Sequence, residues 1–189
     1  MTAIEVLDGA LLSTVQDLGR FGAQQYGVPV SGAMDVWALR AANRLVGNDE
    51  GAAALEITLA GPVLRFDRPG VIAVTGADLG ACLDGQPMPS WQAVGVAAGS
   101  ELSFSGVRDG LRAYLGVGGG IDVPLVLGSR STLLTARLGP SGVTEIPPSS
   151  SHCPLREPRV TLESQPTPNS TPADNWVLRV SSLRAMRSR

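Results

Sequence analysis

The chain has 189 residues, 43% hydrophobic content and a net charge of -2, which suits one globular domain with an appendage. Its basic residues are all arginines, so a P-loop lysine, a Schiff-base lysine and a lysine general base are excluded. The charges form no basic cluster of the kind that binds nucleic acid, and no apolar run approaches the ~20 residues that span a bilayer. We therefore expect a cytoplasmic protein with neither nucleic-acid nor membrane partners.

The composition changes abruptly near Gly139. Of the 23 glycines, 22 lie at or before Gly139, whereas eight of the 14 prolines lie at or after Pro140. Glycine supplies the positive φ angles of tight turns, so residues 1–139 are predicted to be a turn-rich domain and residues 140–189 a disordered Pro- and Ser-rich tail. His152 and Cys153 lie in that tail. The domain therefore keeps only Cys82 and has no residues for a histidine-dependent triad or a multi-thiolate metal site.

Short apolar or alternating runs bounded by Gly, Pro or Asp predict strands at 4–7, 13–15, 54–59, 63–66, 71–75, 92–97, 101–104 and 111–117. Reversing sequences predict turns at Asp8-Gly9, Arg68-Pro69-Gly70, Asp84-Gly85 and Asp109-Gly110. Many short strands with frequent turns favour a mainly β fold, either a barrel or a sandwich. Glu56 alternates with Leu55 and Ile57 in its strand, so we expect its side chain on the solvent face.

One segment, residues 35–46, has the period of a helix and is followed by Gly47 as a stop signal. Its apolar stripe is predicted to consist of Trp37, Ala38, Ala41 and Leu45. Asp35 stands at the start, where its carboxylate can accept a hydrogen bond from a backbone N–H of the first turn, an interaction worth about 1 kcal/mol. For Asp35, spacing alone favours this capping role over catalysis.

A glycine cluster follows the last predicted strand: Gly116, Gly118, Gly119 and Gly120. Ile121 occupies the place of the third glycine of a dinucleotide-binding loop, and the lysine and Ser/Thr of a nucleotide loop are absent. We interpret the cluster as a sharp turn, with an anion-binding backbone as the alternative.

Six ordered blocks resemble the biotin-dependent carboxyltransferase family: TVQDLGRFG (14–22), GVPVSGAMD (27–35), ANRLVGN (42–48), LEITLAGP (55–62), TGADL (75–79) and GLRAYLGVGGGIDVPLVLGSRST (110–132). The family includes allophanate hydrolase subunit 2, the matching region of urea carboxylase and the C component of the bacterial 5-oxoprolinase. The resemblance implies that residues 1–139 form a cyclophilin-like β-barrel module of the A/B carboxyltransferase type. It ends after Arg137, so we expect a truncated or frameshifted member that lacks the further C-terminal half.

The resemblance implies two different reactions. In the first, the chain is a subunit of an ATP-dependent 5-oxoprolinase that opens 5-oxo-L-proline to glutamate, with ATP bound by or shared with partner subunits. In the second, it helps to move a carboxyl group from carboxybiotin to urea or a related amide in an allophanate hydrolase-type complex. The lack of a fused biotin-carrier segment favours the first. A non-catalytic regulatory or binding module is the remaining alternative, strengthened if residues 176–183 fold back onto the domain.

Both reactions act on an amide-like group and develop negative charge on oxygen, so they need fixed donors and a carboxylate for proton transfer. The catalytic candidates are Asp17, Arg20 and Asp35. The candidates for substrate binding are Gln16, Ser31, Gly32, Thr75, Gly76, Asp78, Arg130 and Ser131, with no metal ligands. A structural ion pair is the simpler interpretation of Asp17 and Arg20.

Four of the later candidates have predicted settings of their own. Thr75, Gly76 and Asp78 are expected in a polar turn that leaves an apolar strand, where a loop can carry function. Arg130 can bind a carboxylate with two N–H groups or clamp the missing half of the family architecture.

Overall fold

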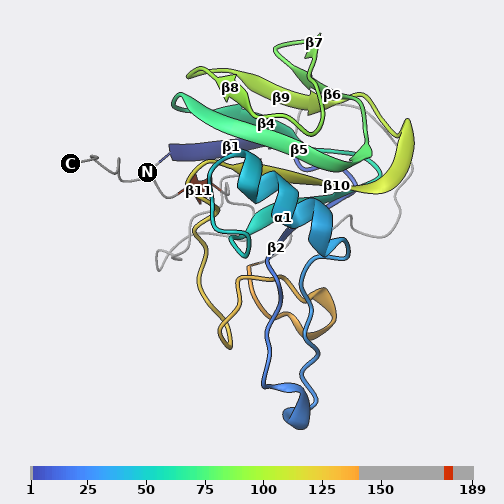
Figure 1. The fold of residues 1–189 in the computed structure, drawn as a ribbon, viewed down its shortest axis with the longest axis vertical. Coiled ribbons are helices and arrows are strands. Elements are labelled where there is room, and N and C mark those ends of the chain that lie inside the picture. The colour runs from blue at the N-terminus through green and yellow to red at the C-terminus, as the bar shows by residue number, and fades with distance from the viewer. Residues whose placement is uncertain (1, 141–176, 181–189) are drawn as a thin grey trace, which may run out of the picture.

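Two antiparallel sheets and one α-helix form the part of the chain that the computed structural model describes, residues 2–140 and 177–180 (Figure 1). The first sheet has the spatial order β11 (Val177–Val180), β1 (Thr2–Asp8), β4 (Val63–Phe66), β9 (Glu101–Phe104), β6 (Ala81–Leu83) and β7 (Gln86–Pro87). The second has the order β2 (Leu12–Gln16), β3 (Ala54–Thr58), β10 (Asp109–Val117), β5 (Gly70–Asp78) and β8 (Val94–Val96). Two short 3-10 helices, η1 (Gln24–Tyr26) and η2 (Leu134–Ala136), lie in the connections.

The main hydrophobic core lies between the two sheets. Alternation places every second residue of β4 inward, so Leu64 and Phe66 are buried while Val63 and Arg65 are only partly covered. From the second sheet, Ile72 and Leu115 belong to the same buried cluster. Each fully buried side chain of this size contributes roughly 1.5–3 kcal/mol relative to exposure, which is why the sheets hold together face to face.

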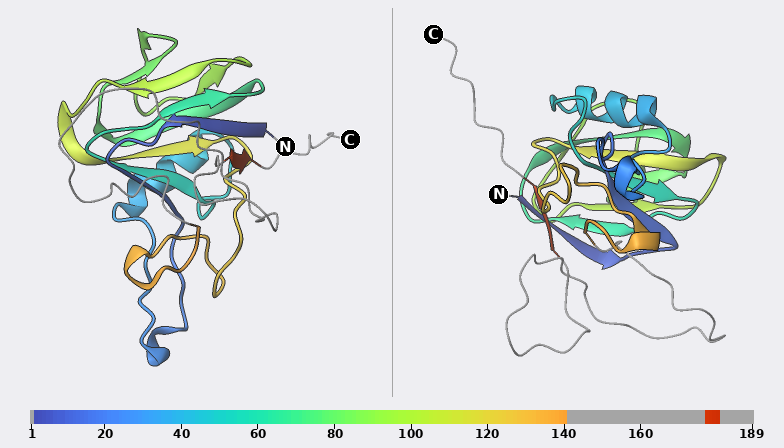
Figure 2. Two further views of the ribbon diagram at one scale, coloured as in Figure 1. Left: turned by 180° about the vertical axis from the view of Figure 1, so that it is seen from behind. Right: turned by 90° about the horizontal axis from the view of Figure 1, so that it is seen from below.

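The outer face of the second sheet is covered by α1 (Val36–Leu45), so the molecule has three layers (Figure 2). The helix buries Ala38, Leu39, Ala42 and Asn43. The predicted stripe was right for Ala38 and wrong for Trp37, which is 78% exposed, and the Arg40 guanidinium lies 5.8 Å from the centroid of its ring. The small side chains of Ala38 and Ala42 let the helix approach the sheet closely, and the bulky indole of Trp37 lies on the outside of the helix.

The close approach of α1 to β10 depends on Gly116. A Cβ at this position would lie 2.8 Å from the carbonyl oxygen of Ala42, whereas a Cβ at Gly95 in β8 would meet nothing within 4 Å. We expect Gly116→Ala to lower the free energy of unfolding by about 1–2 kcal/mol because the helix must move away from the sheet. Gly95→Ala, the matched control, is expected to cause no loss. Equal urea midpoints for the two variants would contradict this packing.

Turn chemistry was predicted correctly in one hairpin and wrongly in another place. Asp84 and Gly85 have φ angles of 51° and 76° and connect β6 to β7, as the dipeptide indicates. Asp109 and Gly110 instead begin β10, where the register with β5 shifts before Ala113. The positive φ of Gly110, 75°, belongs to this irregular pairing, because glycine marks β-bulges as readily as turns.

The mainly β class with one α-helix in the described residues is confirmed, while the cyclophilin-like barrel stays a prediction. The predicted disordered tail falls largely outside the described residues, as do His152 and Cys153. The exception is β11, which pairs antiparallel with β1, so this piece of the predicted 176–183 segment forms an edge strand of the first sheet. Within 2–140 and 177–180, no helix has the length and apolar character needed to cross a membrane.

Candidate functional site

A long loop, residues 17–33, projects from the end of β2 and carries η1, with the segment 121–140 beside it (Figures 1 and 2). The two limbs of this loop are paired through the Arg20 N–H to the Val30 carbonyl at 2.7 Å and the Ala33 N–H to the Asp17 carbonyl at 3.0 Å. Gly19 and Gly32 have φ angles of 95° and 90°, and a Cβ at Gly32 would lie 2.8 Å from the Gly19 nitrogen. Only glycine fits at both positions of this contact.

The Asp17 carboxylate connects this loop to residues 129–131. It accepts hydrogen bonds from the Ser129 hydroxyl at 2.7 Å, the Arg130 backbone N–H at 2.6 Å and the Gly19 N–H at 2.7 Å. The Ser131 hydroxyl donates to the same carboxylate and accepts from the Asp17 N–H. One side chain thus holds together two segments more than 100 positions apart in the chain.

The hydrogen bonds also set the charge of Asp17. Burial alone would raise the pKa of its carboxyl group, but the donors from Ser131, Arg130, Ser129 and Gly19 outweigh it and lower the pKa below its ordinary value. Asp17 is therefore an anion at neutral pH with both oxygens occupied. Such a carboxylate is suited to holding structure, and its lowered pKa makes it a weak proton acceptor.

Arg20 is not the partner of Asp17, so the interpretation of the two as an ion pair was wrong. Its side chain is fully buried, and its Nη2 donates to the Ser131 carbonyl. Within the described residues, its Nε and Nη1 have no hydrogen-bond partner and no carboxylate lies within ion-pairing distance of its guanidinium. The four neutral donors around Asp17 explain this separation, because they satisfy the carboxylate without the guanidinium.

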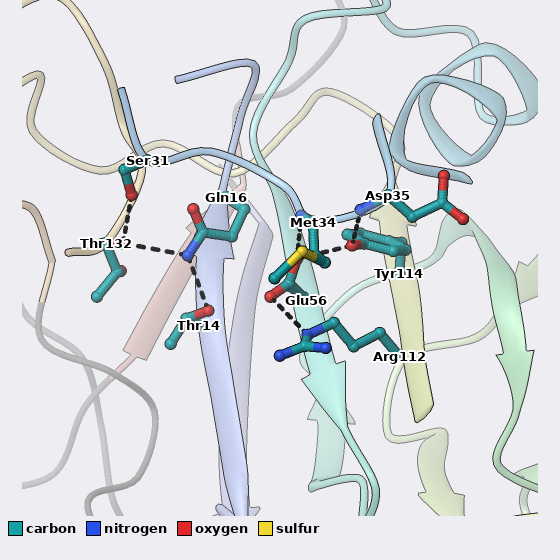
Figure 3. Close-up of polar contacts among 9 residues, drawn as sticks. All are labelled: Thr14, Gln16, Ser31, Met34, Asp35, Glu56, Arg112, Tyr114 and Thr132. Atoms are coloured by element: carbon teal, nitrogen blue, oxygen red, sulfur yellow. Dashed lines mark hydrogen bonds and ion pairs between the residues drawn. The ribbon is translucent and has the colours of Figure 1, made fainter. Parts of the chain in front are cut away.

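Gln16 and Ser31 meet at the next carbonyl, that of Thr132 (Figure 3). The Gln16 Nε2 donates to this oxygen at 3.1 Å and to the Thr14 hydroxyl at 3.0 Å, and the Ser31 hydroxyl donates to it at 3.0 Å. The Gln16 Oε1 is buried without a partner among the residues that the structure describes. We call the following group the Asp17 cluster: Gln16, Asp17, Arg20, Ser31, Gly32, Ser129, Ser131 and Thr132.

Six of the predicted site residues thus gather in the Asp17 cluster, and Arg130 joins it only through its backbone N–H. The Arg130 guanidinium donates to the Val123 carbonyl at 3.0 Å and pairs with Asp122 at 3.2 Å. The Arg130 guanidinium therefore has partners within the chain, where it holds the segment after β10.

The remaining predicted residues lie elsewhere. Asp35 caps α1 by accepting from the Ala38 N–H at 3.0 Å, which confirms the capping interpretation. The predicted polar turn is wrong, because β5 continues through Thr75 and Gly76 to Asp78. The Thr75 hydroxyl donates to the Ala38 carbonyl at 2.7 Å, and Asp78 accepts from the Gly80 N–H at 2.8 Å. No hydrogen bond described for these side chains reaches the Asp17 cluster.

Glu56 and Tyr114 were missed by the sequence analysis, and the solvent-facing position expected for Glu56 is wrong (Figure 3). Glu56 is 9% exposed and accepts from the Tyr114 hydroxyl at 2.7 Å and the Met34 N–H at 2.9 Å. The Arg112 Nε lies 3.5 Å from its other oxygen. Alternation misleads here because α1 covers the second face of the sheet. Leu55 and Ile57 point to the opposite face from Glu56, so its immediate neighbours in β3 do not indicate that its own face is covered.

Tyr114 links this carboxylate to the start of α1. Its hydroxyl donates to Glu56 and accepts from the Asp35 N–H at 2.7 Å. Burial and the neighbouring Glu56 carboxylate raise the pKa of Tyr114, so its hydroxyl stays protonated and can donate. The pair therefore fixes residues 34–35, which connect the Asp17 cluster to the helix.

The glycine turn after β10 has no N–H available for an anion. Gly118 donates to the Val71 carbonyl, Gly119 to the Asn48 side chain and Gly120 to the Val117 carbonyl, each at 2.8 Å. The interpretation as a turn is confirmed. Across the described ranges, no three His, Cys, Asp or Glu side chains gather to form a metal site.

The chain matches the family model described as carboxyltransferase domain, subdomain A and B, over residues 26–181. It is 47% identical over 139 residues to the urea amidolyase of Saccharomyces cerevisiae, covering 73% of this chain and 8% of that protein. It is 43% identical over 136 residues to the C component of the 5-oxoprolinase of Escherichia coli, and the match covers 72% of this chain and 44% of that protein. The chain thus spans less than half the length of these relatives, while the family match runs past Arg137, where we expected the resemblance to end.

Solved structures are also similar to this chain. The chain is similar to Kluyveromyces lactis urea carboxylase with 47% identity and a TM-score of 0.67, covering 69% of this chain and 12% of that one. It is similar to TTHA0988 with 33% identity and a TM-score of 0.76, and the match covers 99% of this chain and 32% of that one.

Proposed function

This chain belongs to the carboxyltransferase domain family of subdomains A and B, and from that membership we propose that it is one component of an ATP-dependent 5-oxoprolinase. Such an enzyme opens the lactam of 5-oxo-L-proline to glutamate. The observation that carries the proposal is the 43% identity to the 5-oxoprolinase C component, of which the chain spans 44%. The Asp17 cluster supports it, because a buried guanidinium with N–H groups to spare suits chemistry that places negative charge on oxygen.

The chain is proposed to work only with partner subunits. The glycine turn at 118–120 uses its N–H groups internally, and the sequence has no lysine for a phosphate loop. We therefore place the ATP site on a partner or at an interface with one. Because the proposed reaction needs ATP, we propose that the complex is cytoplasmic.

Carboxyl transfer to urea is the second candidate, and the 47% identity to urea amidolyase favours it. In that reaction the chain would act with a partner that carries biotin. A non-catalytic binding module is the third, since β11 pairs with β1 and extends the first sheet. The three candidates differ in whether the chain changes a reaction rate and in which reaction responds.

The test is ATP-dependent conversion of 5-oxo-L-proline to glutamate by the two partner subunits of a 5-oxoprolinase, measured with and without this chain. We expect glutamate formation to require ATP and all three components. A full-length 5-oxoprolinase C component serves as the positive control, and biotin-dependent carboxylation of urea is assayed in parallel. Failure of this chain where the control succeeds would contradict the 5-oxoprolinase proposal, and a response in the urea assay would favour the second candidate.

A further inference from the structure

We infer that the Arg20 guanidinium is the binding site for the carboxylate group of a small ligand. The site deepens the proposed function, on which the choice of 5-oxo-L-proline as one ligand rests. The residues that carry the inference are Arg20 itself, Gln16 and the Asp17 carboxylate that Arg20 does not pair with.

Among the described residues, the buried Arg20 guanidinium has no ion-pair partner, although a buried charge usually has one. Its side chain is 0% exposed, yet among the described residues only Nη2 has a partner, the neutral carbonyl of Ser131. A buried ion costs several kcal/mol in solvation unless an opposite charge and hydrogen bonds replace the water. A buried guanidinium with no ion-pair partner among the described residues is expected to attract an anion.

Comparison with the other arginines of residues 2–140 shows that Arg20 is exceptional. Six of them lie within 4.0 Å of a carboxylate oxygen: Arg40, Arg44, Arg65, Arg68, Arg112 and Arg130. The two others with no carboxylate partner in this range, Arg108 and Arg137, are exposed, so water solvates them. Arg20 alone combines full burial with an unpaired charge within the described range.

The hydrogen bonds of Asp17 also explain why Arg20 makes no ion pair with it among the described residues. Asp17 lies three positions before Arg20, but its oxygens are taken by the hydroxyls of Ser129 and Ser131 and by two backbone N–H groups. These donors are neutral, so Asp17 keeps its negative charge, and it makes no ion-pair contact with Arg20 among the described residues. The Asp17 cluster therefore holds a fixed anion, Asp17, and a separate cation, Arg20, whose Nε and Nη1 have no hydrogen-bond partner among the described residues.

The chemistry of the site selects a small carboxylate. A guanidinium offers N–H groups in a plane that matches the two oxygens of a carboxylate. Gln16 reaches the carbonyl next to that of Ser131, and its buried Oε1 remains an acceptor without a donor in the described part of the chain. A ligand that carries both a carboxylate and an N–H group would satisfy both side chains, and 5-oxo-L-proline has both. Because Arg20 is covered, the ligand enters only when a covering segment moves, so slow exchange is expected.

The test is a titration of the 15N-labelled 189-residue chain with sodium acetate or 5-oxo-L-proline, against sodium chloride at equal ionic strength. We expect both carboxylates, and not chloride, to shift the Nε–H resonance of Arg20. Arg20→Lys keeps the charge but loses the planar donors, so it should weaken binding at least about tenfold. Arg65→Lys, at an exposed ion pair on the other sheet, should leave the affinity unchanged.

The outcomes separate the site from the proposed function. A response of Arg20 to both carboxylates supports both, whereas a response to acetate alone supports the site and overturns 5-oxo-L-proline as its ligand. If neither carboxylate shifts the Arg20 resonance in the wild-type chain beyond chloride, the site is overturned. The wild-type measurement decides even if Arg20→Lys does not fold.

Discussion

Asp17→Ala is expected to lower the free energy of unfolding by about 3–5 kcal/mol, because buried donors in the 17–33 loop and in residues 129–131 lose their acceptor. The hydroxyls of Ser129 and Ser131 and the N–H groups of Gly19 and Arg130 all donate to this carboxylate. Each buried donor left without a partner costs about 1–3 kcal/mol, and local relaxation recovers part of the sum.

Urea denaturation at pH 7 measures the effect. Asp122→Asn is the matched control, since Asp122 is partly exposed and pairs with Arg130, and it should cost less than about 1 kcal/mol. Asp17→Asn keeps the shape but loses the charge and should fall between the two. A loss for Asp17→Ala no larger than that of the control would show that this carboxylate does not organise the loop.

The same carboxylate makes stability depend on pH. The pKa of Asp17 is lowered in the folded chain, so its contribution is fully present above the unfolded value of about 3.9 and is lost as the pH falls through the lower folded value. Below about pH 4, we therefore expect the wild-type chain to lose stability more steeply than Asp17→Ala. Parallel curves for the two proteins in this range would contradict the lowered pKa.

Tyr114→Phe is expected to lower the free energy of unfolding by about 2–3 kcal/mol. The substitution removes one hydroxyl that both donates to Glu56 and accepts from the Asp35 N–H, while the ring and its packing against α1 remain. The Asp35 N–H then loses its acceptor and the buried Glu56 carboxylate loses a donor.

A double-mutant cycle with Glu56→Gln isolates the contact. We expect a coupling energy of about 1 kcal/mol or more, as is usual for hydrogen-bonded neighbours. Tyr26→Phe is the matched control, because Tyr26 is 80% exposed in η1 and should change stability by less than about 0.5 kcal/mol. Equal effects of Tyr114→Phe and Tyr26→Phe, with no coupling to Glu56, would rule out a buried pair.

Local features of the fold could be predicted from the sequence because local residues determine them. The bounds of β4 and β9 agree with the predicted strands 63–66 and 101–104, and the Asp35 cap marks the start of α1. Alternation and capping act over a few residues, so they are visible without the fold.

What could not be predicted depends on contacts between distant parts of the chain. Ser129 and Ser131, over 100 positions away in the chain, donate hydrogen bonds to the Asp17 carboxylate. The nearby Arg20 therefore has no ion-pair partner within the described residues. Glu56 is buried because α1 returns over the sheet, which alternation within one strand cannot reveal. In both cases a polar residue has its charge and burial decided by a segment that the local pattern does not include.

Amide hydrogen exchange at Gly19 and Arg130 decides most directly whether Asp17 holds the loop and residues 129–131 together as one site. In the wild-type chain, both N–H groups should be protected, because each donates to the Asp17 carboxylate. In Asp17→Ala, protection should fall at these two amides while that of Leu115 in the buried β10 persists. Rapid exchange at Gly19 and Arg130 in the wild-type chain, or protection that Asp17→Ala leaves unchanged, would contradict this arrangement.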